Sequence, residues 1–258
     1  FYGCEEVTML TIPASMTKIG NYAFAGCGSS DGELTVTFAE RTEELSFGNG
    51  VFSECYIEEL SIPASVTLSD DFLGGLEVDR IVPADDHPTL QSDEYALYLT
   101  ENGAMVTLLR FQPTAEANLS AFDIHASVKT IAANAFEGAQ LTALTFEDGS
   151  QLESIGERAF YGSSLVTITL PESAFTIGSY AFAQISKLYD KCTTRIDLGG
   201  ATSIGDHAFF NTGYTTLKVT IPASVKEIGA FAFADDSSYG VYLAGVTLSG
   251  GLEVIGEN

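Results

Sequence analysis

A short phrase of the form Ile-Gly-x-x-Ala-Phe recurs along the chain and constrains its fold more than any other feature. The phenylalanines that close the copies are Phe24, Phe52, Phe136, Phe160, Phe182, Phe209 and Phe233. Outside one gap of 84 residues, they are 28, 24, 22, 27 and 24 residues apart. A repeat of this length is typical of a solenoid, in which each unit buries its apolar face against its neighbours.

A second pattern, an alternation of apolar and other residues that often closes on proline, lies between the copies. Examples are Val7–Pro13, Ile57–Pro63, Leu165–Pro171 and Leu217–Pro222. Period-two alternation rich in β-branched residues predicts a strand, and proline cannot donate to the ladder. A short extended segment follows, and we expect Gly20 to lead into one helical turn that Gly26 ends. Each repeat is thus predicted to be a strand, a bend, a short strand and a helical turn.

The long gap contains a pattern that differs from the repeats. Two alternating apolar runs, Tyr95–Thr100 and Ala104–Leu109, flank Glu101-Asn102-Gly103. Asn-Gly between such runs is a strong signal of a β-hairpin. We therefore predict a hairpin inserted near residues 84–113.

The charge of the chain limits its partners. Asp and Glu number 35 against 11 Lys and Arg, which gives a formal net charge of −24. Such a surface repels phosphate backbones and anionic membranes, so we expect no nucleic-acid partner. No run approaches 18 apolar residues, so we expect no membrane insertion. The charge favours solubility outside the cell, with basic partners or calcium as the alternative interpretation.

Three of the four cysteines follow the repeat. Cys4, Cys27 and Cys55 each lie three residues after a phenylalanine, in a slot that mostly takes small side chains. We interpret them as buried thiols that pack as small hydrophobic groups. Zinc would need paired Cys or His at short spacing, which these do not supply. Cys192 stands alone, and the redox state of all four stays open.

Motifs that carry chemistry elsewhere have simpler explanations here. Gly28–Gly32 matches G-x-S-x-G but lies in a run of loop-forming residues and precedes a strand. The acidic pairs Asp70-Asp71, Asp85-Asp86 and Asp235-Asp236 are interpreted as solvated turns, because no calcium-loop pattern accompanies them. His87, His125 and His207 are far apart in sequence. We therefore expect no catalytic, cofactor or metal site.

One position of each predicted strand lies on its exposed side and forms a ladder of mainly threonine. These residues are Thr11, Thr37, Ser61, Asp123, Thr145, Thr169, Asp197, Thr220 and Thr247. Such a ladder is either the β-propensity of a solvated sheet or a docking surface, since solenoids bind along their sheets. Tyr95, Tyr98 and Phe111 of the insertion are candidates for an aromatic patch, or they seal the core.

Units of the form L-T-x-L-x-I-P-A-S-V-x-x-I-G-x-x-A-F-x-G-C resemble the BspA-type leucine-rich repeats. The resemblance covers nearly the whole chain, including the insertion between His87–Ser92 and Phe111-Gln112-Pro113. It implies a leucine-rich-repeat solenoid, usually on secreted or surface proteins of oral and gut anaerobes and some protozoan parasites. Members are associated with adhesion to host matrix proteins and with bacterial co-aggregation, and the family has no catalytic residues. Arg80, near the end of a strand, and His125, in place of a proline, depart from the pattern.

We therefore expect one β-rich, right-handed α/β-type leucine-rich-repeat solenoid over residues 1–258, with parallel strands and short helical turns. A degenerate repeat and the β-hairpin insertion are expected at about 64–118. Both ends of the chain lie in mid-repeat, which predicts a fragment of a longer array. The expected function is non-enzymatic recognition outside the cell, through host-matrix or other surface proteins. The alternative is a passive spacer. Exposed aromatic residues along the sheet would favour binding, and a uniformly polar sheet would favour the spacer.

Overall fold

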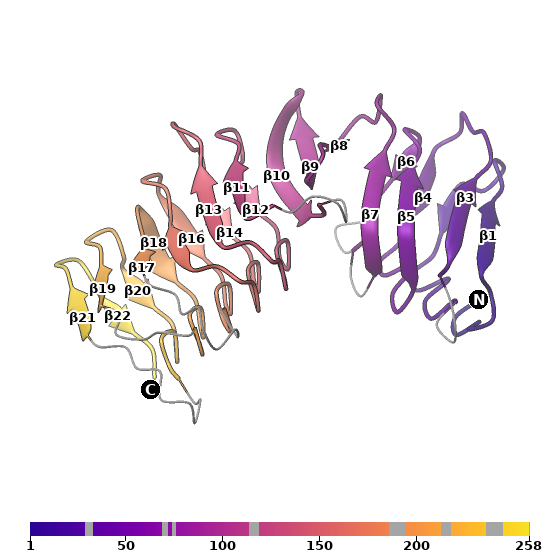
Figure 1. Ribbon diagram of the computed structural model, residues 1–258. Helices are drawn as coiled ribbons and strands as arrows, with labels where there is room; N and C mark the ends of the chain where they lie inside the picture. The colour runs from indigo at the N-terminus through magenta and orange to yellow at the C-terminus, as the bar shows by residue number, and fades with distance from the viewer. Residues whose placement is uncertain are drawn as a thin grey trace. The chain divides into compact units, whose positions relative to one another are not determined.

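The computed structural model describes residues 1–28, 33–68, 72–73, 76–113, 119–185, 195–212, 218–235 and 245–257. Regular structure in these residues consists of β-strands, and each repeat supplies one front strand and one back strand (Figure 1). The front strands are β1 (Met9–Ile12), β3 (Thr35–Phe38), β5 (Tyr56–Ile62), β7 (Glu77–Pro83), β11 (Ala121–Ile124), β13 (Ala143–Phe146), β15 (Thr167–Thr169), β17 (Arg195–Asp197), β19 (Lys218–Ile221) and β21 (Gly245–Leu248). The back strands are β2 (Lys18–Ile19), β4 (Leu45–Phe47), β6 (Val66–Thr67), β12 (Thr130–Ile131), β14 (Ser154–Ile155), β16 (Phe175–Ile177), β18 (Ala201–Ile204), β20 (Glu227–Ile228) and β22 (Val254–Ile255).

The chain divides into two compact units. Unit 1 comprises Phe1–Leu97 and Gln112–Thr114, and unit 2 comprises Tyr98–Phe111 and Ala115–Asn258. In unit 1 the front strands pair in parallel as β1-β3 and β5-β7, and the back strands form the sheet β2-β4-β6. In unit 2 the front strands form β11-β13-β15-β17 and β19-β21, and the back strands follow one another from β12 to β22. Each unit therefore has the parallel-strand solenoid architecture that the repeats predict.

The recurrent phenylalanines stack into a column through the core. In unit 2 the rings of Phe160 and Phe182 lie 4.9 Å apart, with 5° between their planes. The column comprises Phe111, Phe136, Phe160, Phe182, Phe209 and Phe233. In unit 1, Phe1, Phe24 and Phe52 stack in the same way. Burial of one such ring contributes about 1.5–3 kcal/mol, so the column is a main source of cohesion between repeats.

The prediction of a helical turn in each repeat is wrong, because the described residues contain no helix. The second variable residue of the phrase is left-handed instead, with φ near 54° at Tyr22, Arg158, His207 and Phe231. A left-handed residue cannot continue a right-handed helix, so the phrase folds as successive tight turns. The positive φ expected at Gly26 is confirmed at 70°.

These turns are hydrogen-bonded sideways, to the next repeat. Within one turn, Tyr161 N–H donates to the Arg158 carbonyl at 3.0 Å. The N–H of the preceding residue, Phe160, points away from its own turn and donates to the Ala181 carbonyl of the following repeat at 2.7 Å. The repeats approach closely here: a Cβ on Gly205 would lie 2.7 Å from the carbonyl carbon of Gly178. The glycine of the phrase is therefore needed for close packing between repeats.

The predicted hairpin is confirmed in the insertion. β9 (Ala96–Glu101) and β10 (Ala104–Phe111) are sheet neighbours, joined by Asn102 and Gly103 with φ of 51° and 78°. Two positive φ values in a two-residue loop are the signature of a type I′ turn.

The second hairpin strand takes the place of a back strand. Leu108 of β10 lies opposite Ile131 of β12, in parallel register. Phe111 N–H donates to the Ala135 carbonyl at 2.8 Å, the same bond that Phe136 makes to Ala159. Phe111 is thus the column phenylalanine of this repeat, which resolves its two interpretations in favour of the core. Its position, one repeat length before Phe136, was the available sequence signal.

Next to the insertion, a side chain makes the backbone hydrogen bonds that a neighbouring strand would otherwise make. The Gln112 side chain is 2% exposed and pairs with the backbone of Ile81, accepting its N–H at 2.9 Å and donating to its carbonyl at 2.8 Å. The departure at Arg80 is accommodated because Ile81, at 0% exposure, takes the core position while Arg80 is only half-buried. β7 therefore keeps its core despite the charge.

His87 fixes the segment that leads to β8 (Leu90–Ser92). It is 8% exposed, and its Nδ1 accepts the N–H groups of Thr89 and Leu90 at 3.3 and 3.1 Å. Its Nε2 lies 3.1 Å from the Val66 carbonyl, which requires the proton on Nε2. Burial lowers the pKa of His87 below its ordinary value of 6.5. A second proton on Nδ1 would remove the hydrogen bonds that this atom accepts from the Thr89 and Leu90 N–H groups.

The column predicts a large effect of Phe160→Ala. Phe160 is 1% exposed, so truncation leaves a cavity between Phe136 and Phe182 and should lower the free energy of unfolding by about 3–5 kcal/mol. Phe231→Ala, at a ring that is 37% exposed, should cost clearly less. Chemical denaturation measures both, and equal losses would contradict the assigned core.

The left-handed turn position can be tested at Arg158. Arg158→Val and Arg158→Asn both remove the ion pair with Glu137 and the contact with the Tyr161 ring. Their difference therefore reports mainly the backbone conformation at this position. We expect the valine variant to be less stable by about 1–2 kcal/mol, because a β-branched residue tolerates this conformation poorly. Identical denaturation midpoints would disprove the conformational role.

His87 predicts a pH-dependent stability. Because its folded pKa lies below the unfolded value, the unfolded state binds the proton more tightly; stability is complete above pH 6.5 and falls as the pH drops below it. His87→Asn keeps an acceptor for the two N–H groups but does not titrate. The thermal midpoint of the natural protein should therefore fall more steeply than that of the variant between pH 7.5 and pH 5. Parallel curves would exclude His87 as the cause.

Candidate ligand-binding face

The predicted ladder lies on the outer side of the front strands, which we call the front face. Cross-strand register pairs Thr11 with Thr37, Asp123 with Thr145, Thr169 with Asp197, and Thr220 with Thr247. Ser61 lies opposite Val82. All nine predicted residues are exposed except Asp197, which is half-buried. The structure therefore aligns these residues within each sheet as the sequence predicts, and whether they bind a ligand stays a prediction.

The ladder residues interact chiefly with one another and with the backbone. The hydroxyl oxygens of Thr11 and Thr37 are 3.0 Å apart, and Thr145 Oγ1 donates to the Phe122 carbonyl at 3.4 Å. Asp197 Oδ1 accepts the N–H of Gly199 at 3.2 Å and so closes its own loop. The front face thus presents short polar side chains that are already oriented, which lowers the entropy lost when a ligand binds.

In unit 1 the front face carries more charge and one exposed aromatic ring. β5 and β7 present Glu58, Glu59 and Asp79 outward, and Tyr56 is 40% exposed beside them. Tyr56 OH donates to Asp79 Oδ2 at 2.9 Å, and this hydrogen bond raises the pKa of Tyr56. Tyr56 was not among the residues singled out by sequence, although its place at the start of a strand after Cys55 was visible.

The aromatic patch, one of the two interpretations of Tyr95, Tyr98 and Phe111, does not form. Tyr98 is 0% exposed and packs edge-on against His125 at 5.8 Å, so its assignment to a ligand face is wrong. Ala96, Leu97 and Tyr98 are all buried, so both sides of β9 are covered here, and strand alternation in the sequence could not reveal that. Tyr95 is half-buried, and a hydrogen bond with Glu94 raises its pKa. Phe111 belongs to the core column.

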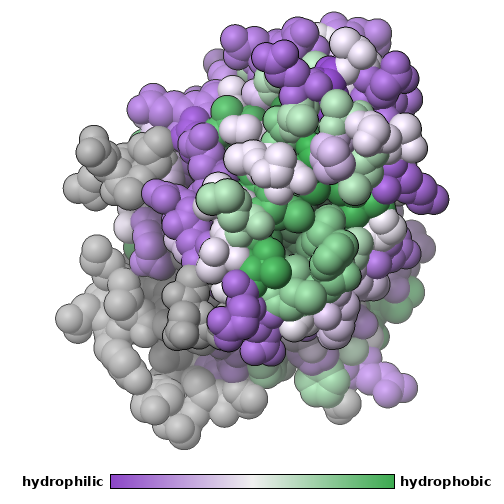
Figure 2. All heavy atoms as spheres, turned by 90° about the vertical axis from the view of Figure 1, so that its right-hand side faces the viewer, coloured by the Kyte–Doolittle hydropathy of each residue, from purple (hydrophilic) through white to green (hydrophobic). Residues whose placement is uncertain are grey.

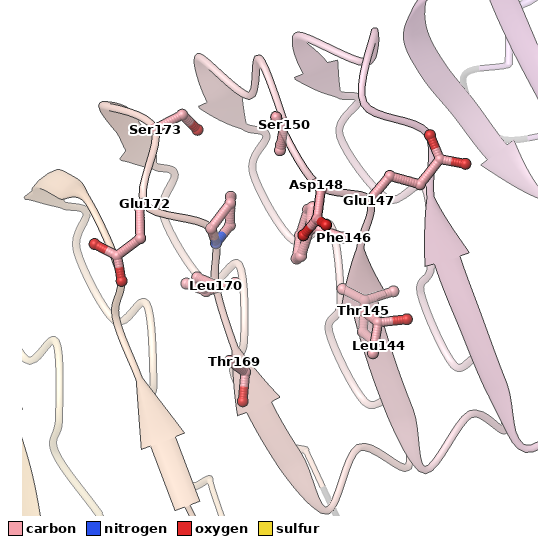
Figure 3. A pocket seen from close by; sticks show the side chains of 12 residues that line it. Leu144, Thr145, Phe146, Glu147, Asp148, Ser150, Thr169, Leu170, Glu172 and Ser173 are labelled. Atoms are coloured by element: carbon pink, nitrogen blue, oxygen red, sulfur yellow. The ribbon is translucent and has the colours of Figure 1, made fainter.

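A hollow of about 640 Å³ opens in unit 2, where β13 and β15 end. Its floor includes the buried Leu170 with the half-buried Phe146 and Pro171. Asp148 and Glu172, both exposed, stand on the two loops that border it (Figure 3). The hollow is thus apolar at its base and acidic at its rim.

The hollow exists because its two bordering loops are attached to different neighbours. The loop after β13 bonds to the preceding repeat: Ala126 N–H donates to Glu147 Oε2 at 2.8 Å, and His125 Nδ1 lies 3.3 Å from Glu147 Oε1. The loop after β15 bonds to the following repeat, where Gly200 N–H donates to the Pro171 carbonyl at 2.8 Å. β13 and β15 pair at Ala143 and Thr167, near their starts.

Glu147 is occupied by these contacts. The backbone N–H of Ala126 and, secondarily, His125 lower the pKa of Glu147, so its carboxylate is held in the charged form. His125 takes the position of a proline and binds the loop with its ring instead. Sequence reasoning did not single out the hollow. Its signal was the segment between Phe146 and Ser154, which is longer than the corresponding segment after Ile12.

The cysteines agree with their interpretation as packing groups. Cys27 and Cys55 are each 1% exposed, and Cys4 is half-buried; all three are free thiols. Burial raises the pKa of Cys55 to about 11, so this thiol stays protonated at neutral pH. Among the described residues, no group of three or more His, Cys, Asp or Glu is arranged to hold a metal ion. Cys192, Ser29–Gly32, Asp70-Asp71 and Asp236 lie outside the described residues.

One further surface is apolar. At the end of unit 1 that β1 forms, hydrophobic side chains gather inside a hydrophilic rim (Figure 2). Phe1 is 81% and Met9 71% exposed there. Across the part of the chain that the structure describes, no helix has the length and apolar character needed to cross a membrane.

Three solved structures share the fold. The pneumococcal vaccine antigen PcpA is 20% identical with a TM-score of 0.64, and the match covers 98% of this chain and 68% of that one. A leucine-rich repeat protein from Eubacterium ventriosum is 20% identical, with a TM-score of 0.61 and coverage of 98% and 78%. A leucine rich cell surface protein from Faecalibacterium prausnitzii is 19% identical, with a TM-score of 0.59 and coverage of 97% and 62%. At these identities the likeness shows the fold alone.

The family is shown by sequence. No curated protein matches the chain. The model of the BspA type leucine rich repeat region matches residues 1–73 and 114–257 in six copies. These two ranges leave out the stretch that holds the hairpin, and they contain the recurrent phenylalanines and the front-face ladder described above. The chain therefore belongs to the BspA-type leucine-rich repeat family.

Proposed function

We propose that this chain is a non-enzymatic recognition domain that acts outside the cell and binds other proteins along its front face. The ligands that we propose are host extracellular-matrix proteins or other surface proteins. Two of the similar structures are described as a vaccine antigen and a cell surface protein, which supports an extracellular location. Membership of a repeat family whose solenoids serve as binding scaffolds supports recognition over catalysis.

The observation that carries the proposal is the ordered front face. Thr11 and Thr37, and likewise Thr220 and Thr247, repeat the same exposed hydroxyl on paired strands. Repetition on a rigid parallel sheet places equivalent polar groups at the strand spacing of about 4.8 Å. Such a surface can contact an extended partner at many points, each of them weak. Affinity then comes from the sum of the contacts and needs no deep pocket.

A second candidate, a passive spacer, is favoured by a different observation. In unit 2 the ladder residues Asp123, Thr145 and Thr169 are uniformly polar, and the phenylalanine column stiffens each stack of repeats. A spacer needs stiffness and a solvated surface, and it needs no complementary partner.

Biolayer interferometry separates the two candidates. The domain is immobilised and exposed to fibronectin, fibrinogen, laminin and mucin near physiological salt, with an unrelated protein of similar acidity as control. We expect saturable binding of at least one ligand that persists at ~0.3 M salt, beyond the reach of charge attraction alone. Signals that never exceed the control across the panel would favour the spacer.

Matched variants locate the binding surface. Thr37→Arg and Thr220→Arg place a large charged group on the front face of each unit. Thr176→Arg places the same group on the exposed side of back strand β16. The front-face variants should weaken binding roughly tenfold or more, because a single misplaced bulky side chain disrupts a packed interface, and Thr176→Arg should leave it unchanged. Equal effects of all three would show that the front face is not the binding surface.

A further inference from the structure

We propose that the hollow between β13 and β15 is a subsite for an arginine side chain of the bound protein. The inference rests on the proposed recognition function and names the chemistry of one contact within it. The hollow lies beside the front face, since Thr145 and Thr169 of the ladder belong to its lining. A partner that follows the ladder therefore passes directly over it.

The floor and the rim of the hollow fit the two parts of an arginine. Leu170 and Pro171 offer apolar surface to the methylene stem, and the half-buried ring of Phe146 offers a face on which a planar guanidinium stacks. Asp148 and Glu172 belong to the lining on opposite loops; the Asp148 carboxylate lies beside Phe146, whereas the Glu172 side chain extends from its loop away from Asp148 (Figure 3). A delocalised guanidinium presents several N–H donors in one plane and binds carboxylates in a forked geometry, which lysine does not do.

His125 pairs with Glu147 and does not neutralise the carboxylates of Asp148 and Glu172. His125 lies against Glu147, which both Ala126 and His125 hold on the side of the preceding repeat. Asp148 and Glu172 remain directed to solvent on the two loops, and the chain as a whole carries a net charge of −24. A cation that enters the hollow thus meets the exposed Asp148 carboxylate, with Glu172 on the other loop, and the negative charge of the whole chain favours its approach.

A buried hydroxyl in the lining also lacks a partner. Among the described residues, Ser173 Oγ is buried and makes no hydrogen bond. Because this oxygen is closed off from solvent, it is not a contact for the bound side chain. The loops after β15 and β17 leave no such space between them. After β17, a Cβ on Gly199 would meet the Pro171 carbonyl, so those loops pack directly together.

The test uses two peptides that differ only at the guanidinium group, which citrulline replaces by an uncharged urea. Acetyl-Gly-Ser-Arg-Ser-Gly amide and its citrulline counterpart are titrated into the ¹⁵N-labelled domain at 0.15 M NaCl, and amide shifts are followed by NMR. We expect saturable shifts with the arginine peptide, centred on Thr145, Gly149, Thr169 and Ser173, and none with citrulline. Equal shifts with both peptides, or shifts spread over the acidic surface, would overturn the subsite.

Variants of equal charge provide the control. Asp148→Asn with Glu172→Gln should weaken binding of the arginine peptide roughly tenfold, because it removes both rim carboxylates. Glu157→Gln with Glu227→Gln removes two exposed carboxylates elsewhere in unit 2 and should leave the affinity unchanged. Similar affinities for both double variants would refute the assignment.

The outcome separates the subsite from the broader function. If a matrix protein binds and the Asp148→Asn, Glu172→Gln variant binds it equally well, without arginine-specific shifts, recognition stands and the subsite fails. If no matrix protein binds while arginine-specific shifts centre on the hollow, the subsite stands and the matrix assignment fails.

Discussion

The hydrogen bonds that run sideways from one turn to the next hold the repeats together. In each turn, alternate N–H groups bond within the turn and to the next repeat, as Tyr161 and Phe160 do. A helix would direct its N–H groups along its own axis, and its greater width would keep the repeats further apart. The left-handed residue at Arg158 and its equivalents makes the tighter arrangement possible. Phenylalanine stacking near 5 Å and the parallel register of the strands both depend on this close spacing.

Much of this fold is readable from sequence, because period and alternation are local signals. The spacing of the phenylalanines predicted the stacked repeats, and Asn102-Gly103 predicted the hairpin and its turn. The conformation of the turns was not predictable in the same way. Tyr22, Arg158 and Phe231 are all residues for which a positive φ is uncommon, and only contacts between repeats offset its cost. A helix was the reasonable local expectation, and tertiary bonding overrode it.

In the candidate site too, the features set by a local pattern were predictable, and the features set by neighbouring segments were not. The exposed ladder followed from strand alternation alone, and the structure places it where the sequence does. Tyr98 was misplaced because its strand is covered on both sides by its neighbours, which alternation in a single sequence does not reveal. The hollow depends on which neighbour each loop bonds to, through Glu147 on one side and Pro171 on the other. The sequence shows that the segment after Phe146 is long, but it does not show which neighbour that segment bonds to.

The position of Phe111 has a consequence for how such arrays change. The chain leaves the repeat pattern before the hairpin, yet Leu108 and Phe111 return to the core in the places that an ordinary repeat would fill. In unit 2 the returning segment restores one strand and one ring, so the core of the repeat is complete after a long excursion. Because the entropy of closing a loop grows only slowly with its length, the tip around Gly103 is a natural place for new sequence to be grafted. The scaffold and its variable parts are thus separable, repeat by repeat.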